Sequence, residues 1–139
     1  MHFTIGSIIF PSDSKDATRL YLGFLIKTLH TLDIHFSGYG SDPLALAEKY
    51  VTGGITCEQC KAESLDWWRY IDSQDAVQAF HDRDVLMARL AICLLSFDEN
   101  DASDLGESLS WFIEVIGFME ADVDKAIEIM INYFEQRSA

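Results

Sequence analysis

The chain has 139 residues, of which 49% are hydrophobic and 12% aromatic, and this composition favours one globular domain over residues 1–139 and excludes a disordered chain. Its formal net charge of -13 argues against direct binding to bare nucleic acid, whose phosphates require lysine and arginine, and against anionic membrane surfaces. Three cysteines, an odd number in a domain of this size, indicate a reducing compartment, so we expect a cytoplasmic protein.

Three helices are predicted in the first half of the chain. They are expected to begin near residues 12, 42 and 56 and to end near residues 32, 51 and 71. Asp42-Pro43 is typical of a capped start with proline in the first turn. Thr56 and Gln59 match a capping box. The apolar segments 3–10 and 34–39 leave room for two short strands, but the density of helix signals favours a helical body.

The second half of the chain also reads as helices. Their expected starts are Ser73 (a short helix to about His81), Asp84, Ser103 or Asp104, and Asp122. The segment 85–97 is hydrophobic all round apart from Arg89, which is typical of a helix surrounded by others. The sequence therefore predicts an all-α, compact single-domain bundle of about six to seven helices around a central apolar helix (85–97), with room for a short N-terminal strand.

Acidic residues are concentrated in one part of the sequence. The segment 90–124 contains no lysine or arginine and nine carboxylates: Asp98, Glu99, Asp101, Asp104, Glu107, Glu114, Glu120, Asp122 and Asp124. The same segment contains Trp111, Phe112 and Phe118, so it is not an acidic tail without structure. A folded, strongly acidic surface predicts a basic partner.

The helix expected from about residue 104 to Met119 has two different faces. Leu105, Leu109, Phe112, Ile113 and Ile116 cluster on one side and should face the core. Trp111 and Phe118 fall on the opposite side, beside Asp104, Glu107 and Glu114. Exposed aromatic side chains among carboxylates are typical of a binding hot spot. The alternatives are that both aromatic rings touch another helix and that the acidic side only keeps the protein soluble.

Cys57 and Cys60 form a Cys-x-x-Cys motif at a predicted helix start, where a thiol pKa is lowered. A redox role would require a preceding strand, and a zinc site would require two more ligands. Neither is evident, so we interpret these cysteines as incidental and predict no metal or cofactor.

His81-Asp82 matches the paired histidine and aspartate of helical metal-dependent phosphohydrolases. A match of two residues is short and arises often by chance, so a surface histidine at a helix end is the better interpretation. A small hydrolase centred on His81 and Asp82 is therefore the alternative to a binding protein. The sequence contains no recognisable nucleophile motif or phosphate loop, so we predict no catalytic residue and no enzyme activity.

The segment Trp67-Trp68-Arg69-Tyr70 resembles a recognition cluster. Trp68 aligns with Leu65 and Ile71, so we expect it to pack inward, with Trp67 and Tyr70 at the surface. The alternative is that all of them belong to the core. Arg89, isolated in the apolar helix, is expected to pair with a carboxylate such as Asp66 or Asp72.

In its size, acidity and helical character, the whole chain resembles the immunity proteins of bacterial polymorphic and contact-dependent-inhibition toxins and the acidic immunity proteins of nuclease colicins. The resemblance implies a stoichiometric inhibitor of a basic, nuclease-type toxin domain. The expected partner-binding residues are Asp98, Glu99, Asp101, Asp104, Glu107, Trp111, Glu114, Phe118 and Trp67. An acidic adaptor or nucleic-acid mimic would use the same surface on a different partner.

Overall fold

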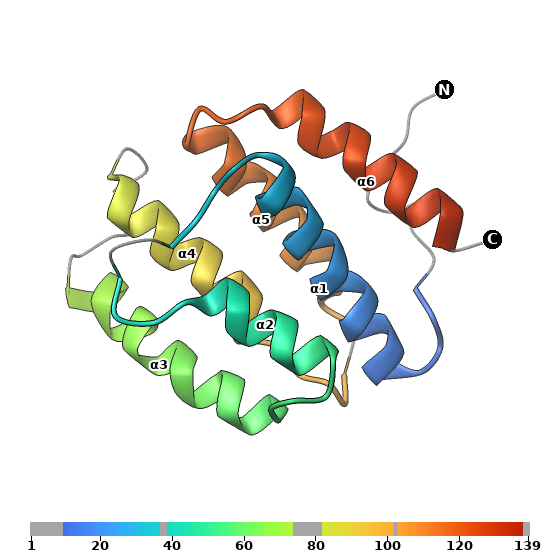
Figure 1. Cartoon of the computed structure of the whole chain (residues 1–139), viewed down its shortest axis with the longest axis horizontal. Helices are drawn as coiled ribbons and strands as arrows, with labels where there is room; N and C mark the ends of the chain where they lie inside the picture. The colour runs from blue at the N-terminus through green and yellow to red at the C-terminus, as the bar shows by residue number, and fades with distance from the viewer. Residues whose placement is uncertain (1–9, 37–38, 74–81, 102, 138–139) are drawn as a thin grey trace.

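The computed structural model describes residues 10–36, 39–73, 82–101 and 103–137, and these residues form six helices (Figure 1). The helices are α1 (Ser14–Thr31), α2 (Pro43–Val51), α3 (Cys57–Ser73), α4 (Arg83–Leu95), α5 (Leu105–Phe118) and α6 (Val123–Arg137). The all-α class is confirmed. Residues 34–36 are not a strand, and the predicted strand at 3–10 lies almost wholly outside the described residues.

Side-chain caps fix the starts of α1, α2 and α3 where the sequence predicts them. The Asp13 carboxylate accepts a hydrogen bond from the backbone N–H of Asp16 at 2.9 Å, and Asp42 caps α2 in the same way. The capping box before α3 is complete. The N–H of Gln59 donates to the Thr56 hydroxyl at 3.1 Å, and the N–H of Thr56 donates to the Gln59 side chain at 2.8 Å.

The start of α4 differs from the prediction. Asp82, and not Asp84, is the N-cap, because its carboxylate accepts hydrogen bonds from the N–H groups of Asp84 and Val85. The short helix predicted from Ser73 to His81 lies outside the described residues beyond its first residue. Asp104 occupies the N-cap position of α5 but forms no side-chain capping bond.

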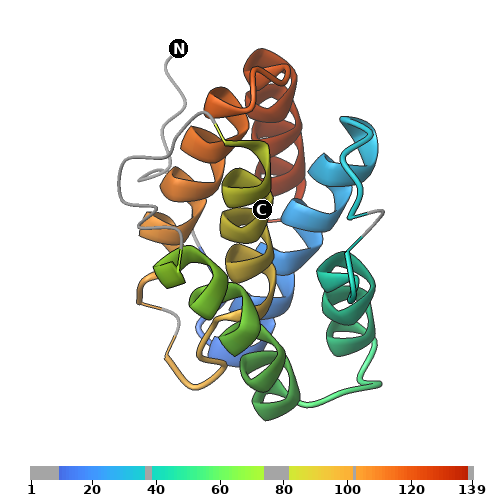
Figure 2. The same cartoon turned by 90° about the vertical axis from the view of Figure 1, so that its left-hand side faces the viewer.

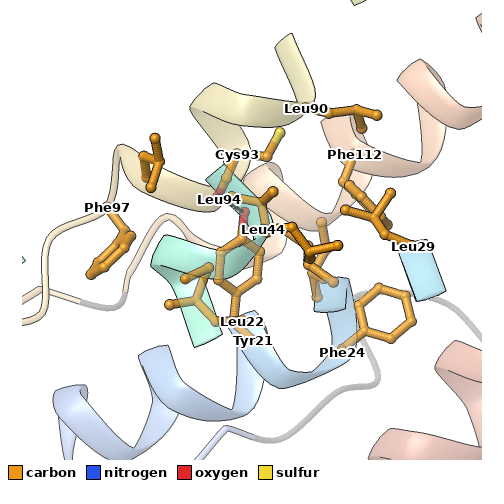
Figure 3. Close-up of a cluster of buried hydrophobic side chains, with 14 of the residues drawn as sticks. Tyr21, Leu22, Phe24, Leu29, Leu44, Leu90, Cys93, Leu94, Phe97 and Phe112 are labelled. Atoms are coloured by element: carbon orange, nitrogen blue, oxygen red, sulfur yellow. Dashed lines mark hydrogen bonds between the residues drawn. The ribbon is translucent and has the colours of Figure 1, made fainter. Parts of the chain in front are cut away.

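Most of α4 is buried. Nine of its thirteen residues are buried, and it contacts α2, α3 and α5. Figure 2 shows it between α3, α5 and the α1–α2 pair. Helix α1 contacts α2, α5 and α6. The Tyr21 hydroxyl joins α1 to α4 by donating to the Cys93 carbonyl at 3.1 Å within the core (Figure 3).

Aromatic rings join α1, α5 and α6 in the same core. Phe24 lies 5.8 Å from Phe112 and 5.3 Å from Phe134, measured between ring centroids. Gly23 allows Tyr133 of α6 to lie against α1, because a Cβ atom at position 23 would collide with the Tyr133 hydroxyl. Among the described residues, no helix has both the length and the apolarity needed to cross a membrane.

Candidate protein-binding surface

The connection between α4 and α5 gathers three carboxylates around one hollow. Asp98, Asp101 and Asp104 line a cavity of about 330 Å³ at this end of the bundle. The rest of its lining is Lys61, Ser96, Phe97, Leu105 and Ser108. Among the described lining residues, three anionic groups therefore share a small concave surface with one cation, Lys61, which leaves the surface acidic.

Local hydrogen bonds fix two of these three carboxylates. Asp98 accepts from the N–H of Asn100 at 2.9 Å, and Asp101 accepts from the N–H of Ser103 at 3.0 Å. Aspartate commonly bonds the backbone two residues ahead in this way. The hydrogen bonds from the side chain and backbone of Ser103 hold the pKa of the Asp101 carboxyl below its ordinary value. This carboxylate therefore stays charged at neutral pH.

Glu99 has a different environment from its neighbours in the turn. It is half-buried and accepts a hydrogen bond from the Tyr50 hydroxyl at 2.7 Å. Burial and the bond to Glu99 raise the pKa of Tyr50 above its ordinary value. The ring of Tyr50 also lies 4.7 Å from that of Phe97. Glu99 thus anchors the turn to α2, while Asp98 and Asp101 face solvent.

The acidic surface continues along α5. Asp104, Glu107, Trp111, Glu114 and Phe118 are spaced three and four residues apart, so they form one stripe of the helix. The three carboxylates are exposed, and Phe118 is 40% exposed. The predicted core side of α5 is confirmed for four of its five members: Leu105, Leu109, Phe112 and Ile116 are buried, and Ile113 is half-buried.

Trp111 is half-buried and packs against the core. The guanidinium carbon of Arg89 lies 5.2 Å from the centroid of its ring, within the range of a cation–π interaction. The carboxylate of Asp66, a partner expected for Arg89, instead pairs with Arg69 at 3.2 Å. Phe118, 40% exposed, is therefore the more exposed aromatic residue of this stripe.

The predicted orientation of Trp68 is wrong. Trp68 is 43% exposed, whereas Trp67 is half-buried and lies 6.0 Å from Phe36 between ring centroids. The reason is that α3 packs through a stripe of mostly small residues: Cys57, Cys60, Ser64, Trp67 and Ile71. Leu65 and Trp68 lie next to that stripe and face outward. The spacing of three and four residues was visible in the sequence, but small residues mark a core stripe weakly.

The cysteines belong to the core. Cys57, Cys60 and Cys93 are all buried as free thiols. Burial raises the pKa of Cys60 to about 11 and that of Cys93 to about 12, and it also raises that of Cys57. A reactive thiol requires a lowered pKa. Within the described ranges, no group of three or more histidine, cysteine or carboxylate side chains is placed to bind a metal.

Little in the described structure bears on the alternative centred on His81 and Asp82. Asp82 directs its carboxylate to the first N–H groups of α4, where it serves as a cap. His81 lies outside the described residues. No match is found when the chain is compared with protein-family models, curated proteins and solved structures. The chemistry of the surface is therefore what indicates function.

Proposed function

We propose that this protein is a stoichiometric inhibitor that binds a basic protein through its acidic face. The acidic face comprises Asp98, Asp101, Asp104, Glu107, Glu114 and Phe118. One observation carries the proposal: the exposed carboxylates of the α4–α5 turn share a hollow and continue along the outer stripe of α5, with Phe118 at the far end.

The charge of this face suits capture of a basic partner. Its carboxylates are exposed, and the segment 90–124 that carries them contains no lysine or arginine. Such a surface accelerates the encounter with a positively charged protein, and salt weakens the effect because it screens exposed charges. The expected signature is a fast association rate that falls as ionic strength rises.

Phe118 supplies apolar contact area, which the carboxylates lack. Charges steer a partner, but apolar contact area that loses its water on binding contributes most of the affinity at a hot spot. Phe118 is a large apolar side chain that is 40% exposed at the last residue of α5. Trp111, two turns earlier in α5, is half-buried and supports the same stripe from the core side.

The class of partner follows from the charge. Nucleases bind phosphates through clusters of lysine and arginine, so their clefts are basic. A rigid acidic face of this kind covers such a cleft and excludes the nucleic acid. We therefore infer an immunity-type inhibitor of a cytoplasmic, nuclease-type bacterial toxin domain, with no catalytic role of its own.

Two charge variants test the proposal. The reversed variant carries Asp101→Lys, Asp104→Lys and Glu107→Lys, and the matched variant carries Asp16→Lys, Asp72→Lys and Glu128→Lys. Both change the net charge equally, and all six side chains are exposed. The matched variant alters α1, α3 and α6 and leaves the acidic face intact. Circular dichroism establishes that each variant is folded.

Affinity-tagged protein is exposed to an extract of the cells that encode it, at low and at high salt, and captured proteins are identified by mass spectrometry. The expected result is a basic protein bound one to one, released by salt, retained by the matched variant and lost from the reversed variant. Purified partner should have nuclease activity that one equivalent of this protein abolishes. Capture of a DNA-binding protein without nuclease activity would indicate nucleic-acid mimicry instead. Equal capture by both variants would contradict the acidic-face model.

A further inference from the structure

A second hollow, of about 510 Å³, lies at the opposite end of α4 from the acidic turn. It is lined by Tyr39, Gly40, Ser41, Glu63, Asp66, Trp67, Tyr70 and Asp84. These residues come from the loop before α2, the middle of α3 and the first turn of α4. None of them belongs to the acidic face. The volume lies within the range of pockets that bind small organic molecules or a side chain of a partner.

Aromatic rings form one part of this pocket and hold one another in place. The rings of Tyr39 and Trp67 lie 5.5 Å apart between centroids, and Trp67 also contacts Phe36 in the core. Tyr70 adds a third ring one turn further along α3. Because Trp67 is fixed by two ring contacts, it presents a preformed surface to a ligand and little order is lost on binding.

Carboxylates form the rest of the polar lining. Glu63 and Asp84 are in no ion pair with a described residue, whereas Asp66 pairs with Arg69 on the outer side of α3. Asp84 is fixed by the Tyr39 hydroxyl, which donates to it at 2.6 Å. Burial, followed by this bond, raises the pKa of Tyr39 to about 12, so the tyrosine remains a neutral donor. None of the described residues that line the pocket is a lysine or an arginine.

We propose that this pocket binds an organic cation, a guanidinium or alkylammonium group that stacks on Trp67 and is neutralised by Glu63 and Asp84. Aromatic faces attract cations, most strongly the indole of tryptophan, and a planar guanidinium both stacks and forms forked hydrogen bonds with carboxylates. The same lining repels anions. Arginine side chains of a partner protein and free amines share this chemistry. The inference does not depend on the acidic face.

The three tryptophans provide the readout. In a ¹H–¹⁵N NMR spectrum each of Trp67, Trp68 and Trp111 gives one indole signal. The probe is N-acetyl-arginine amide, and its neutral control is N-acetyl-citrulline amide, which has nearly the same shape. We expect the arginine probe to shift the Trp67 signal saturably. The Trp68 signal should stay in place, because Trp68 faces solvent outside the pocket. Equal shifts from the citrulline probe would overturn the proposal.

A pair of variants tests whether the carboxylate of Glu63 contributes to binding of the arginine probe. Glu63 and Glu58 are both exposed carboxylates of α3, but only Glu63 lines the pocket. Glu63→Gln should weaken binding of the arginine probe by about threefold, as expected for one exposed charge pair, and Glu58→Gln should leave it unchanged. Unaltered binding to Glu63→Gln in a folded protein would contradict the assignment.

A second ligand separates the two sources of the cation. Agmatine carries the same guanidinium but has a free primary ammonium in place of the backbone groups of a peptide. Binding of both ligands, or of N-acetyl-arginine amide alone, shows that the pocket accepts an arginine side chain of a protein. Binding of agmatine alone assigns the site to a free amine. A spectrum in which neither ligand moves the Trp67 signal would rule out a cation site.

Discussion

The guanidinium carbon of Arg89 lies 5.2 Å from the centroid of the Trp111 ring and thereby joins α4 to the outer stripe of α5. Trp111 is also packed against the main hydrophobic core. Cation–π contacts contribute on the order of 1 kcal/mol, and more when water is excluded. We therefore assign Trp111 mainly to the stability of α5, and the direct contact with a partner to its exposed neighbours on the stripe.

Trp111→Ala should lower the free energy of unfolding by roughly 2–3 kcal/mol, because it removes a half-buried ring from a packed core together with its contact to Arg89. Urea denaturation followed by circular dichroism measures this change. Trp68→Ala is the control, since Trp68 is 43% exposed and should cost below about 1 kcal/mol. Equal losses in both variants would show that Trp111 is not part of the core.

Phe118→Ala, in contrast to Trp111→Ala, should lower the affinity for the partner more than it lowers stability. Its side chain is 40% exposed at the end of α5, so we expect a loss of stability below about 1 kcal/mol. Affinity for the basic partner should fall by at least about 2 kcal/mol, the size of a hot-spot effect. Isothermal titration calorimetry with the captured partner measures the affinity. Unchanged affinity in a folded variant would remove Phe118 from the interface.

The end of α5 contains a residue in a strained backbone conformation. Glu120 has φ 59°, and the N–H of Ala121 donates to the carbonyl of Ile116 at 3.3 Å, the pattern of a Schellman helix end. Glycine adopts positive φ without strain, so Glu120→Gly should stabilise the fold by about 0.5–1 kcal/mol. Asp33 has φ 58° at the end of α1 but also contacts His35 at 2.6 Å. Asp33→Gly should therefore gain less, and a larger gain there would contradict this explanation.

Buried thiols should make the protein sensitive to alkaline pH. Burial raises the pKa of Cys60 to about 11 and that of Cys93 to about 12, from an ordinary value of 9.0. Their contribution to stability is complete below pH 9 and is lost as the pH rises through the folded-state values. The free energy of unfolding should therefore fall above about pH 9, by up to about 1.4 kcal/mol per pH unit for each thiol.

Urea denaturation between pH 8 and pH 11, in the presence of reductant, follows this loss of stability. Cys93→Ala removes one of the titrating groups, so its curve should be shallower even if the variant is less stable throughout. An identical slope in wild type and Cys93→Ala would show that Cys93 does not cause the pH dependence.

Helix starts were predictable from sequence where one side chain decides them. Asp42-Pro43 and the Thr56–Gln59 capping box are local signals, and the structure contains the hydrogen bonds they imply. The start of α4 was predicted at Asp84, but the carboxylate two residues earlier, that of Asp82, accepts the capping hydrogen bonds.

Packing partners were harder to predict than helices. The core stripe of α3 contains two cysteines and a serine beside Trp67 and Ile71, so the large apolar side chains of Leu65 and Trp68 favoured the wrong side of the helix. The pocket beside Trp67 depends on Tyr39 and Asp84, which are 45 residues apart in sequence and meet only when α3, α4 and the loop before α2 assemble. A contact over that separation has no local sequence signal.

The central claim is that the carboxylates of the α4–α5 turn and α5 capture a basic protein. Stopped-flow measurement of the association rate with the captured partner, at several salt concentrations, tests it most directly. The reversed variant should associate at least about tenfold more slowly than wild type at low salt, with the difference shrinking as salt rises. The matched variant should stay within about twofold of wild type. Equal association rates for the two variants would show that overall charge, and not the acidic face, governs binding.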